Sequence, residues 1–90
     1  MSYSIEAIHS AEKELNRLDT KIYRIIERII DSLAEQPRPN GSKKLTDSKN
    51  LWRIRVGRIR LIYSVDDIEK KVTIVRVVKR DESTYEGLLN

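Results

Sequence analysis

The stretch that decides the fold is Leu51-Trp52-Arg53-Ile54-Arg55-Val56-Gly57-Arg58-Ile59-Arg60-Leu61-Ile62-Tyr63. Apolar and basic residues alternate on both sides of a single glycine, and alternation with a period of two is typical of a half-buried β-strand. We therefore predict two strands, about 51–56 and 58–65, with a turn at Gly57. One face of this hairpin carries the side chains of Trp52, Ile54, Ile59, Leu61 and Tyr63. The opposite face carries those of Arg53, Arg55, Arg58 and Arg60.

Four guanidinium groups on one side of a hairpin repel one another, which lowers stability. A polyanionic partner would offset that repulsion. The net charge of +4 is uneven, since residues 1–42 hold 6 Lys/Arg and 7 Asp/Glu, whereas residues 43–90 hold 12 and 7. The whole basic excess lies in the second half, which favours a nucleic-acid or other polyanion surface there. The alternative is a solvated face that charge keeps soluble.

The length of 90 residues indicates one domain covering 1–90. The chain has no cysteine and one histidine, which leaves no disulfide, thiolate metal site or multi-histidine metal site within one chain. No apolar run approaches the roughly 20 residues of a membrane helix. Residues 1–6 lack the features of a signal peptide. We expect an intracellular, cytoplasmic protein with no membrane contact and no cofactor.

Two helices are expected before the hairpin. A short strand at 3–8 leads to Ser10, which we expect to cap a helix that begins at Ala11. Asp19-Thr20 offers a second cap. The residues beyond it form an apolar stripe at helical spacing, namely Ile22, Ile25, Ile26, Ile29, Ile30 and Leu33. The two helices should form a helical hairpin with one shared apolar face.

Turns divide the remaining chain. Residues 37–42 hold two prolines and Asn-Gly, which predict a loop, and residues 43–50 read as a polar connector. A second turn at 66–70 precedes the near-continuous apolar run 72–78, which is typical of a central strand. The tail 79–90 has the pattern of a short helix. The predicted fold is therefore α+β, with an N-terminal strand, a helical hairpin and an antiparallel three-stranded meander, the helices packed on one sheet face.

Most catalytic arrangements are absent. His9 lies far in sequence from the basic cluster, and we expect it to be structural or exposed. Asp66, Asp67 and Glu69 suggest either a cation site or, more simply, a solvated turn. Arginine binds phosphate bidentately and keeps its charge when partly desolvated. The hairpin arginines, with Lys43, Lys44, Lys79 and Arg80 as further candidates for contact, could grip an RNA backbone or stabilise a phosphorane-like transition state.

Tyr85 follows the basic cluster in sequence. A tyrosine at an RNA site could stack on a base or take part in proton transfer. The alternative is that Tyr85 packs the tail against the rest of the protein. The residues themselves leave both interpretations open.

With this basic hairpin and this order of elements, the chain resembles the RelE/ParE toxin superfamily, and within it the RelE-like mRNA interferases. The resemblance covers nearly the whole length. Its anchors are 11–15 (Ala-Glu-Lys-Glu-Leu), Lys44-Leu45, the hairpin segments 51–57 and 60–63, and 77–80 (Val-Val-Lys-Arg).

The resemblance implies a toxin of a type II toxin–antitoxin system that enters the ribosomal A site and cuts the mRNA there. It implies a RelB-like antitoxin as partner, in a hetero-oligomeric complex. Carried over residue by residue, the family's working positions fall on Arg53, Arg55, Arg60, Arg80 and, after a one-residue shift, Tyr85.

The chain departs from the family at two of these positions, Arg53 and Arg55, and at Thr46. The first two are often lysine, and arginine does not readily lose its proton, which argues against a general-base role for Arg53 or Arg55. Orientation and charge stabilisation remain open to both. Thr46 stands where a further basic residue often follows the Lys-Leu pair. The alternative function is that of a ParE-like toxin, which poisons DNA gyrase without nuclease activity, and a third is a relic that only binds antitoxin.

Overall fold

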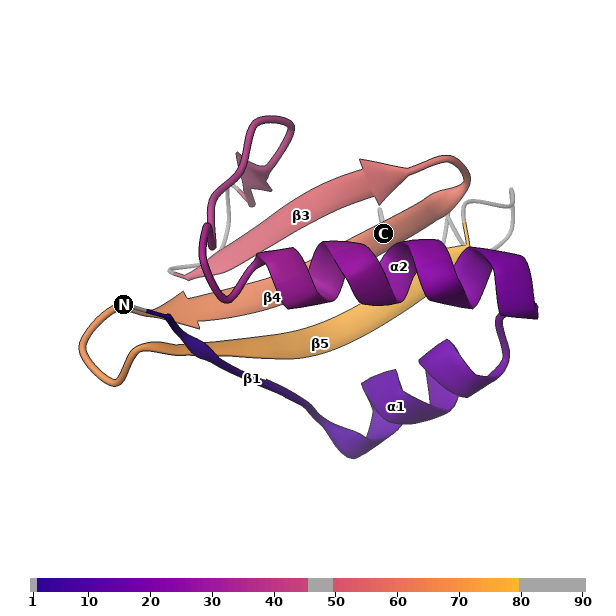
Figure 1. The fold of residues 1–90 in the computed structure, drawn as a ribbon, viewed down its shortest axis with the longest axis horizontal. Coiled ribbons are helices and arrows are strands. Elements are labelled where there is room, and N and C mark those ends of the chain that lie inside the picture. The colour runs from indigo at the N-terminus through magenta and orange to yellow at the C-terminus, as the bar shows by residue number, and fades with distance from the viewer. Residues whose placement is uncertain (1, 46–49, 80–90) are drawn as a thin grey trace.

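A computed structural model describes residues 2–45 and 50–79 of the chain. Within them, two helices lie against a twisted five-stranded sheet (Figure 1). The elements follow the order β1 (Ser4–Ala7), α1 (His9–Asn16), α2 (Thr20–Ser32), β2 (Lys43–Lys44), β3 (Leu51–Val56), β4 (Ile59–Asp66) and β5 (Lys71–Lys79). The predicted α+β fold is therefore confirmed. We expected a short helix in the tail 79–90. Lys79 is the last residue of β5, and residues 80–90 lie outside the described residues.

The sheet has the strand order β1-β5-β4-β3-β2. The meander β3-β4-β5 is antiparallel, as predicted, and β1 adds to it in parallel beside β5. The apolar run of β5 thus lies between two strands, which confirms its prediction as a central strand. One strand was missed, because Lys43 and Lys44 pair with Arg53 and Trp52 where the sequence suggested only a polar connector.

The helix starts follow local hydrogen bonding. Asp19 caps α2, since its carboxylate accepts the Ile22 N–H at 3.1 Å, as predicted. The prediction for α1 was wrong, because α1 begins at His9 and its N-cap is Ile8 rather than Ser10. The Ile8 N–H donates to the Ile74 carbonyl at 3.1 Å and its own carbonyl accepts the Glu12 N–H at 3.0 Å. The chain therefore passes from strand pairing into the helix at Ile8.

The core lies between the helices and one sheet face. Ala11 of α1 and Ile26, Ile30 and Leu33 of α2 are buried there. They meet the expected hairpin face, whose buried members are Ile54, Ile59, Leu61 and Tyr63, with Trp52 and Val56 partly buried beside them. Burial of such side chains is the main favourable term in folding. The predicted packing of an apolar helical stripe on one face of the hairpin is confirmed.

A bulge interrupts the ladder between β4 and β5. Tyr63 pairs with Ile74 and Ile62 pairs with Arg76, so Val75 is an extra residue on β5. Bulges bend a strand and re-aim the side chains that follow. The last residues of β5 therefore take a course that the alternation of the preceding residues does not predict.

Candidate functional site

The basic residues of the two hairpin strands lie on the sheet face opposite the helices. Arg55 of β3 is directly opposite Arg60 of β4, and Arg53 is opposite Ile62. Residues that face each other across two antiparallel strands have Cβ atoms about 4.5–5.5 Å apart. Arg53, Arg55 and Arg60 therefore form one cluster, which we call the arginine face.

Arg58 does not belong to that cluster. The sequence placed it at the start of the second strand beside Arg60, but β4 begins at Ile59, and Gly57 and Arg58 form the two-residue turn between the strands. Gly57 has φ +58°, in the region that favours glycine, and such residues make tight hairpin turns possible. Arg58 is exposed at the tip of the hairpin.

The two lysines of β2 lie on different faces. Lys43 is opposite Arg53 and shares the arginine face, whereas Lys44 is opposite Trp52 and shares the helix side. Both are exposed. The structure thus brings one of the two lysines beside the arginine face and extends its positive charge toward the sheet edge.

Lys79 lies at the opposite end of the sheet, on the helix side. It is opposite Ile59, whose side chain packs in the core. Arg80 and Tyr85, which the resemblance assigns to the working site, lie outside the described residues. Since Val78 is opposite Arg60, the strand that leads into Arg80 passes beside the arginine face.

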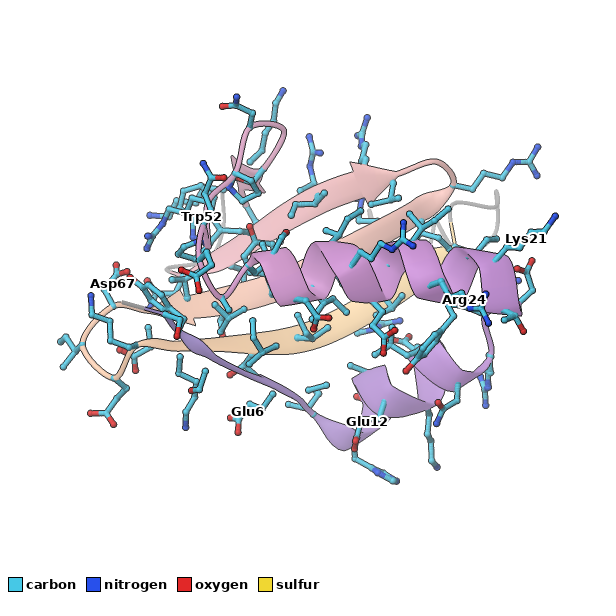
Figure 2. The ribbon with its side chains drawn as sticks, in the orientation of Figure 1. Glu6, Glu12, Lys21, Arg24, Trp52 and Asp67 are labelled. Atoms are coloured by element: carbon cyan, nitrogen blue, oxygen red, sulfur yellow. The ribbon has the colours of Figure 1, made fainter. Side chains whose placement is uncertain are left out.

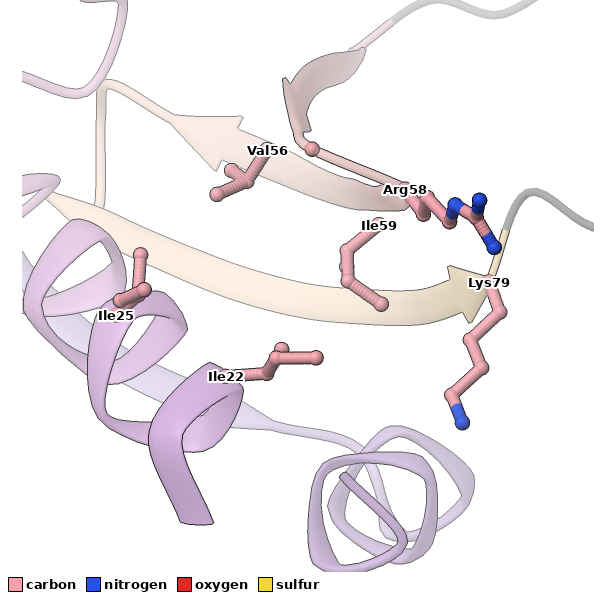
Figure 3. Close-up of a pocket in the computed structure, with 7 residues that line it drawn as sticks. Ile22, Ile25, Val56, Arg58, Ile59 and Lys79 are labelled. Carbon is pink, nitrogen blue, oxygen red and sulfur yellow. The ribbon is translucent and has the colours of Figure 1, made fainter. Parts of the chain in front are cut away.

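Arg58 and Lys79 flank an apolar groove of about 450 Å³ between α2 and the hairpin tip (Figure 3). Ile22 and Ile25 line it from the helix, and Val56 and Ile59 from the strands. Ile25 is 50% exposed. The groove therefore presents apolar side chains to solvent with two cationic groups at one end.

The arginine face is less open than the sequence suggested. Arg55 is exposed, but Arg53 is only partly exposed and so is Arg60. Ile62 and Val78, on the same face, retain 9% and 3% of their exposed area. Alternation places Ile62, an apolar residue, on the basic face. That residue is the one feature of the sequence that indicated this burial. The basic side chains therefore surround an apolar floor.

The acidic residues of the β4–β5 turn serve the fold. Asp66 Oδ1 accepts the N–H groups of Ile68 and Glu69, each at 3.0 Å. Asp67 accepts two hydrogen bonds from Arg38 and one from Tyr3. The interpretation of these acids as turn residues is therefore confirmed. Among residues 2–45 and 50–79, no group of three or more His, Cys, Asp or Glu is placed to hold a metal ion.

His9 is exposed at the start of α1, with Nδ1 3.9 Å from Glu12. It lies on a different element from the arginine face. No helix in the described part of the chain is long and apolar enough to cross a membrane.

Comparison with known proteins identifies the class of protein to which this chain belongs. The chain belongs to the family of ParE toxins of type II toxin–antitoxin systems, whose family model matches residues 6–84. The chain is also 28% identical over 92 residues to the putative toxin RelE1 of Methanocaldococcus jannaschii, with 97% of this chain and 99% of that protein covered. It is 28% identical over 82 residues to toxin RelE of Mycobacterium tuberculosis, with 90% and 84% covered.

A solved structure extends this similarity to three dimensions. The crystal structure of the archaeal RelE–RelB complex from Pyrococcus horikoshii contains a chain with a TM-score of 0.81 and 29% identity to this one. The match covers 91% of this chain and 99% of that chain. The resemblance to the RelE/ParE superfamily is therefore confirmed in sequence and in fold.

Proposed function

We propose that this protein is a type II toxin that cleaves translated mRNA in the ribosomal A site and so inhibits translation in the cytoplasm. The observation that carries the proposal is the cross-strand pair of Arg55 and Arg60 with Arg53 on the same face. Guanidinium groups that share a face can bind neighbouring phosphates of one RNA strand. The similarity to proteins named RelE supports mRNA as that strand.

The chemistry requires little beyond positioning and positive charge. In RNA the 2′-hydroxyl can give up its proton and attack the adjacent phosphorus. The 2′-O–P bond forms, the P–O5′ bond breaks, and the leaving 5′ oxygen takes up a proton, which leaves a 2′,3′-cyclic phosphate and a 5′-hydroxyl. Guanidinium groups stabilise the negative charge that develops on the phosphate oxygens. We assign this role to Arg53, Arg55, Arg60 and Arg80, and proton transfer or base stacking to Tyr85.

Further basic residues would hold the RNA backbone. Lys43 shares the arginine face and Arg58 lies at the hairpin tip. Lys44 and Lys79 lie on the helix side of the sheet, so their contacts would come from RNA that passes over a sheet edge. We assign the four to backbone contacts, which set affinity rather than rate.

We propose a RelB-like antitoxin as the partner that silences the toxin, in a hetero-oligomeric complex. Solved relatives are RelE–RelB complexes. The apolar groove beside Ile25, with Arg58 and Lys79 at its end, suits a partner that offers apolar and acidic side chains. Co-expression with the product of the neighbouring gene should give a complex that co-purifies, and failure to co-purify would contradict this part of the proposal.

The nuclease proposal is tested with purified toxin and ribosomes programmed with a defined mRNA. Primer extension should reveal cuts inside the codon in the A site, and none on the same mRNA without ribosomes. The matched control is the Arg60→Ala variant. Intact mRNA on toxin-treated ribosomes would contradict the proposal.

A second candidate function is DNA gyrase poisoning, because the matching family model is that of ParE. It predicts gyrase-dependent DNA breaks and intact mRNA in the same preparation of toxin. The arginine face favours the nuclease, since a gyrase poison needs no phosphorane-stabilising cluster. DNA breaks without mRNA cuts would reverse that preference.

A further inference from the structure

The outer edge of β5 loses its strand partner after Ile74. Ser4–Ala7 of β1 pair with Lys71–Ile74, and the chain then turns away into α1 at Ile8. From there β5 continues to Lys79 with β4 on one side and α1 on the other (Figure 1). A second cavity, of about 310 Å³, lies at this edge between the end of α1 and the end of β5.

Three cationic side chains line this cavity, together with one carboxylate. Arg17 is the C-cap of α1, and Arg76 and Lys79 belong to β5. The carboxylate is that of Glu14, whose side chain is 22% exposed. Three positive groups and one negative group give the cavity a formal charge of +2. The cavity therefore favours an anionic ligand.

Glu14 occupies one edge of the Arg76 guanidinium and holds it in place. Oε2 of Glu14 lies 3.1 Å from Nε and 3.0 Å from Nη2 of Arg76, and Oε1 accepts the Val77 N–H at 2.8 Å. A guanidinium group carries five N–H donors in a planar fork. The other edge of this fork, which includes Nη1, has no acceptor among the described residues. Glu14 thus orients Arg76 and leaves donors for a ligand.

The other two cations of the cavity are not neutralised by the described part of the fold. Arg17 and Lys79 are exposed, and neither forms an ion pair with a described carboxylate. Because the Val77 N–H donates to α1, it points away from β4, and in the alternating pattern of an antiparallel pair the Lys79 N–H does so too. Side-chain and backbone donors of this kind bind phosphate oxygens.

The position of the cavity fits a ligand that also reaches the arginine face. Val78 is opposite Arg60, while its neighbours Val77 and Lys79 line the cavity. Neighbouring strands are about 4.8 Å apart, so an RNA backbone on the arginine face has only β5 to cross before it reaches the edge. The volume lies at the lower end of the range for ligand pockets, about 300–1,000 Å³, which suits one phosphate group.

We propose that the cavity lined by Arg17, Arg76 and Lys79 binds a backbone phosphate of RNA, at a site separate from the arginine face. This inference rests on the proposed function, in which RNA is the ligand. The phosphate belongs either to the mRNA or to ribosomal RNA, because both present the same group. Contacts to the backbone position the RNA, so this site should set affinity rather than the rate of cleavage.

The test compares Arg17→Ala and Arg17→Lys with the wild type in the full chain. The ribosomes carry an mRNA with 2′-deoxynucleotides in the A-site codon, so that binding is measured without cleavage. Loss of a charge-assisted hydrogen bond in Arg17→Ala should weaken binding about tenfold. Loss of one phosphate contact should also make the slope of log affinity against log salt shallower by about 0.7. Arg17→Lys keeps the charge and should retain the slope.

Arg28→Ala is the matched control. It also removes one exposed guanidinium group, but Arg28 does not line the cavity. It lies eight residues after Thr20, which is about 12 Å along α2. This variant should bind like the wild type, with the same salt slope.

Ribosomes without mRNA identify the source of the phosphate. If the effect of Arg17→Ala persists on them, the phosphate is that of ribosomal RNA. If the effect requires mRNA, the phosphate is that of the mRNA. Either result supports the site, because the cavity then binds an RNA backbone.

Other outcomes separate this site from the proposed function. A wild type that binds programmed ribosomes and leaves ordinary mRNA intact overturns the nuclease function, while the binding comparison still tests the cavity. A folded Arg17→Ala variant with wild-type affinity and salt slope overturns the phosphate site. An equal loss in Arg28→Ala overturns it too, as does a loss in Arg17→Ala only for an acidic partner protein. No ribosome binding by the wild type overturns both proposals.

Discussion

At the scale of single residues, the arginine face lowers the stability of the fold, and under the proposed function it binds RNA. Arg55 and Arg60 lie directly opposite each other across β3 and β4, with Arg53 on the same face. Like charges in that position destabilise a sheet. Under the proposed function, this cost in stability is offset when the guanidinium groups bind the phosphates of the RNA.

Arg60→Ala should nearly abolish mRNA cleavage while the protein stays folded. A donor that acts mainly in the transition state contributes about a hundred- to thousandfold in rate. The loss should fall on the single-turnover rate more than on ribosome affinity. We expect the same of Arg80→Ala. Arg58→Ala is the control, because Arg58 lies in the turn, and it should weaken affinity more than rate. An unchanged rate in both Arg60→Ala and Arg80→Ala would show that the proposed active site is wrong.

Arg55→Thr should stabilise the protein and impair cleavage. Removing one of two facing like charges and inserting a β-branched residue is worth about 0.2–1 kcal/mol. Urea unfolding at low ionic strength measures the gain, which should shrink at 1 M salt, where the screening length is about 3 Å. Arg58→Thr in the turn is the matched control and should show little gain. Equal or lower stability of Arg55→Thr at low salt would contradict the repulsion argument.

At the scale of elements, an ionic cluster joins the chain start, the loop after α2 and the β4–β5 turn. Arg38 donates to both oxygens of Asp67, at 3.2 and 2.7 Å, and the Tyr3 hydroxyl donates to Asp67 at 2.6 Å. The Arg38 guanidinium also lies 5.2 Å from the centre of the Trp52 ring. Trp52 and Asp67 accordingly lie at the same end of the sheet (Figure 2).

This cluster predicts a pH dependence of stability. The hydrogen bond from Arg38, and then that from Tyr3, lower the pKa of Asp67 from 3.8 to about 2. A carboxyl group whose pKa is depressed in the folded state stabilises the fold above its unfolded pKa and loses that contribution as the pH falls. The contribution of Asp67 should be complete above pH 3.8 and should disappear as the pH falls through about 2.

Thermal unfolding of the wild type and Asp67→Asn between pH 2 and 6 measures this contribution. The difference in melting temperature should be largest at pH 5–6 and should close toward pH 2. Glu69→Gln in the same turn is the control, because no contact ties Glu69's side chain to the cluster among the described residues, and it should follow the wild type. A difference that does not depend on pH would contradict the assignment.

Local patterns account for the parts of the fold that were predicted correctly. The period-two alternation of the hairpin and the helical stripe of α2 each fix which face is buried. The two residues of β2 are too few to show a period, so the strand was missed. The position of α1 was wrong by two residues because the Ile8–Ile74 hydrogen bond, and not a side-chain cap, starts it.

Some features of the candidate site were predicted from the sequence and others were not. Alternation predicted that Arg53, Arg55 and Arg60 share a face. It failed for Arg58, because the position of the two-residue turn depends on the backbone at Gly57. Sequence reasoning also missed that Nε of Arg76 lies 3.1 Å from Oε2 of Glu14, 62 residues away along the chain. No periodicity in one sequence contains that information.

At the scale of the whole molecule, charge should govern the encounter with RNA. Each phosphate contact on a single strand releases counterions and contributes about −0.7 to the slope of log affinity against log salt. We expect a steep slope for ribosome binding, and one that is shallower by about one contact in Arg55→Ala. Asp31→Asn on the exposed side of α2 changes the net charge in the opposite direction and should leave the slope unchanged. A salt-insensitive affinity would show that the arginine face is not the binding surface.

The parallel pairing of β1 with β5 also determines when this protein can fold. Glu6 and Thr73, which lie side by side, are 67 residues apart in sequence, whereas β3 and β4 are joined by two residues. A hairpin of that kind forms within about 1–10 μs, but distant strands must first close a long loop. Synthesis proceeds from the N-terminus, so β1 has no strand to join until residues 71–74 have been made. The strand that is synthesised first is therefore among the last to be incorporated into the native sheet.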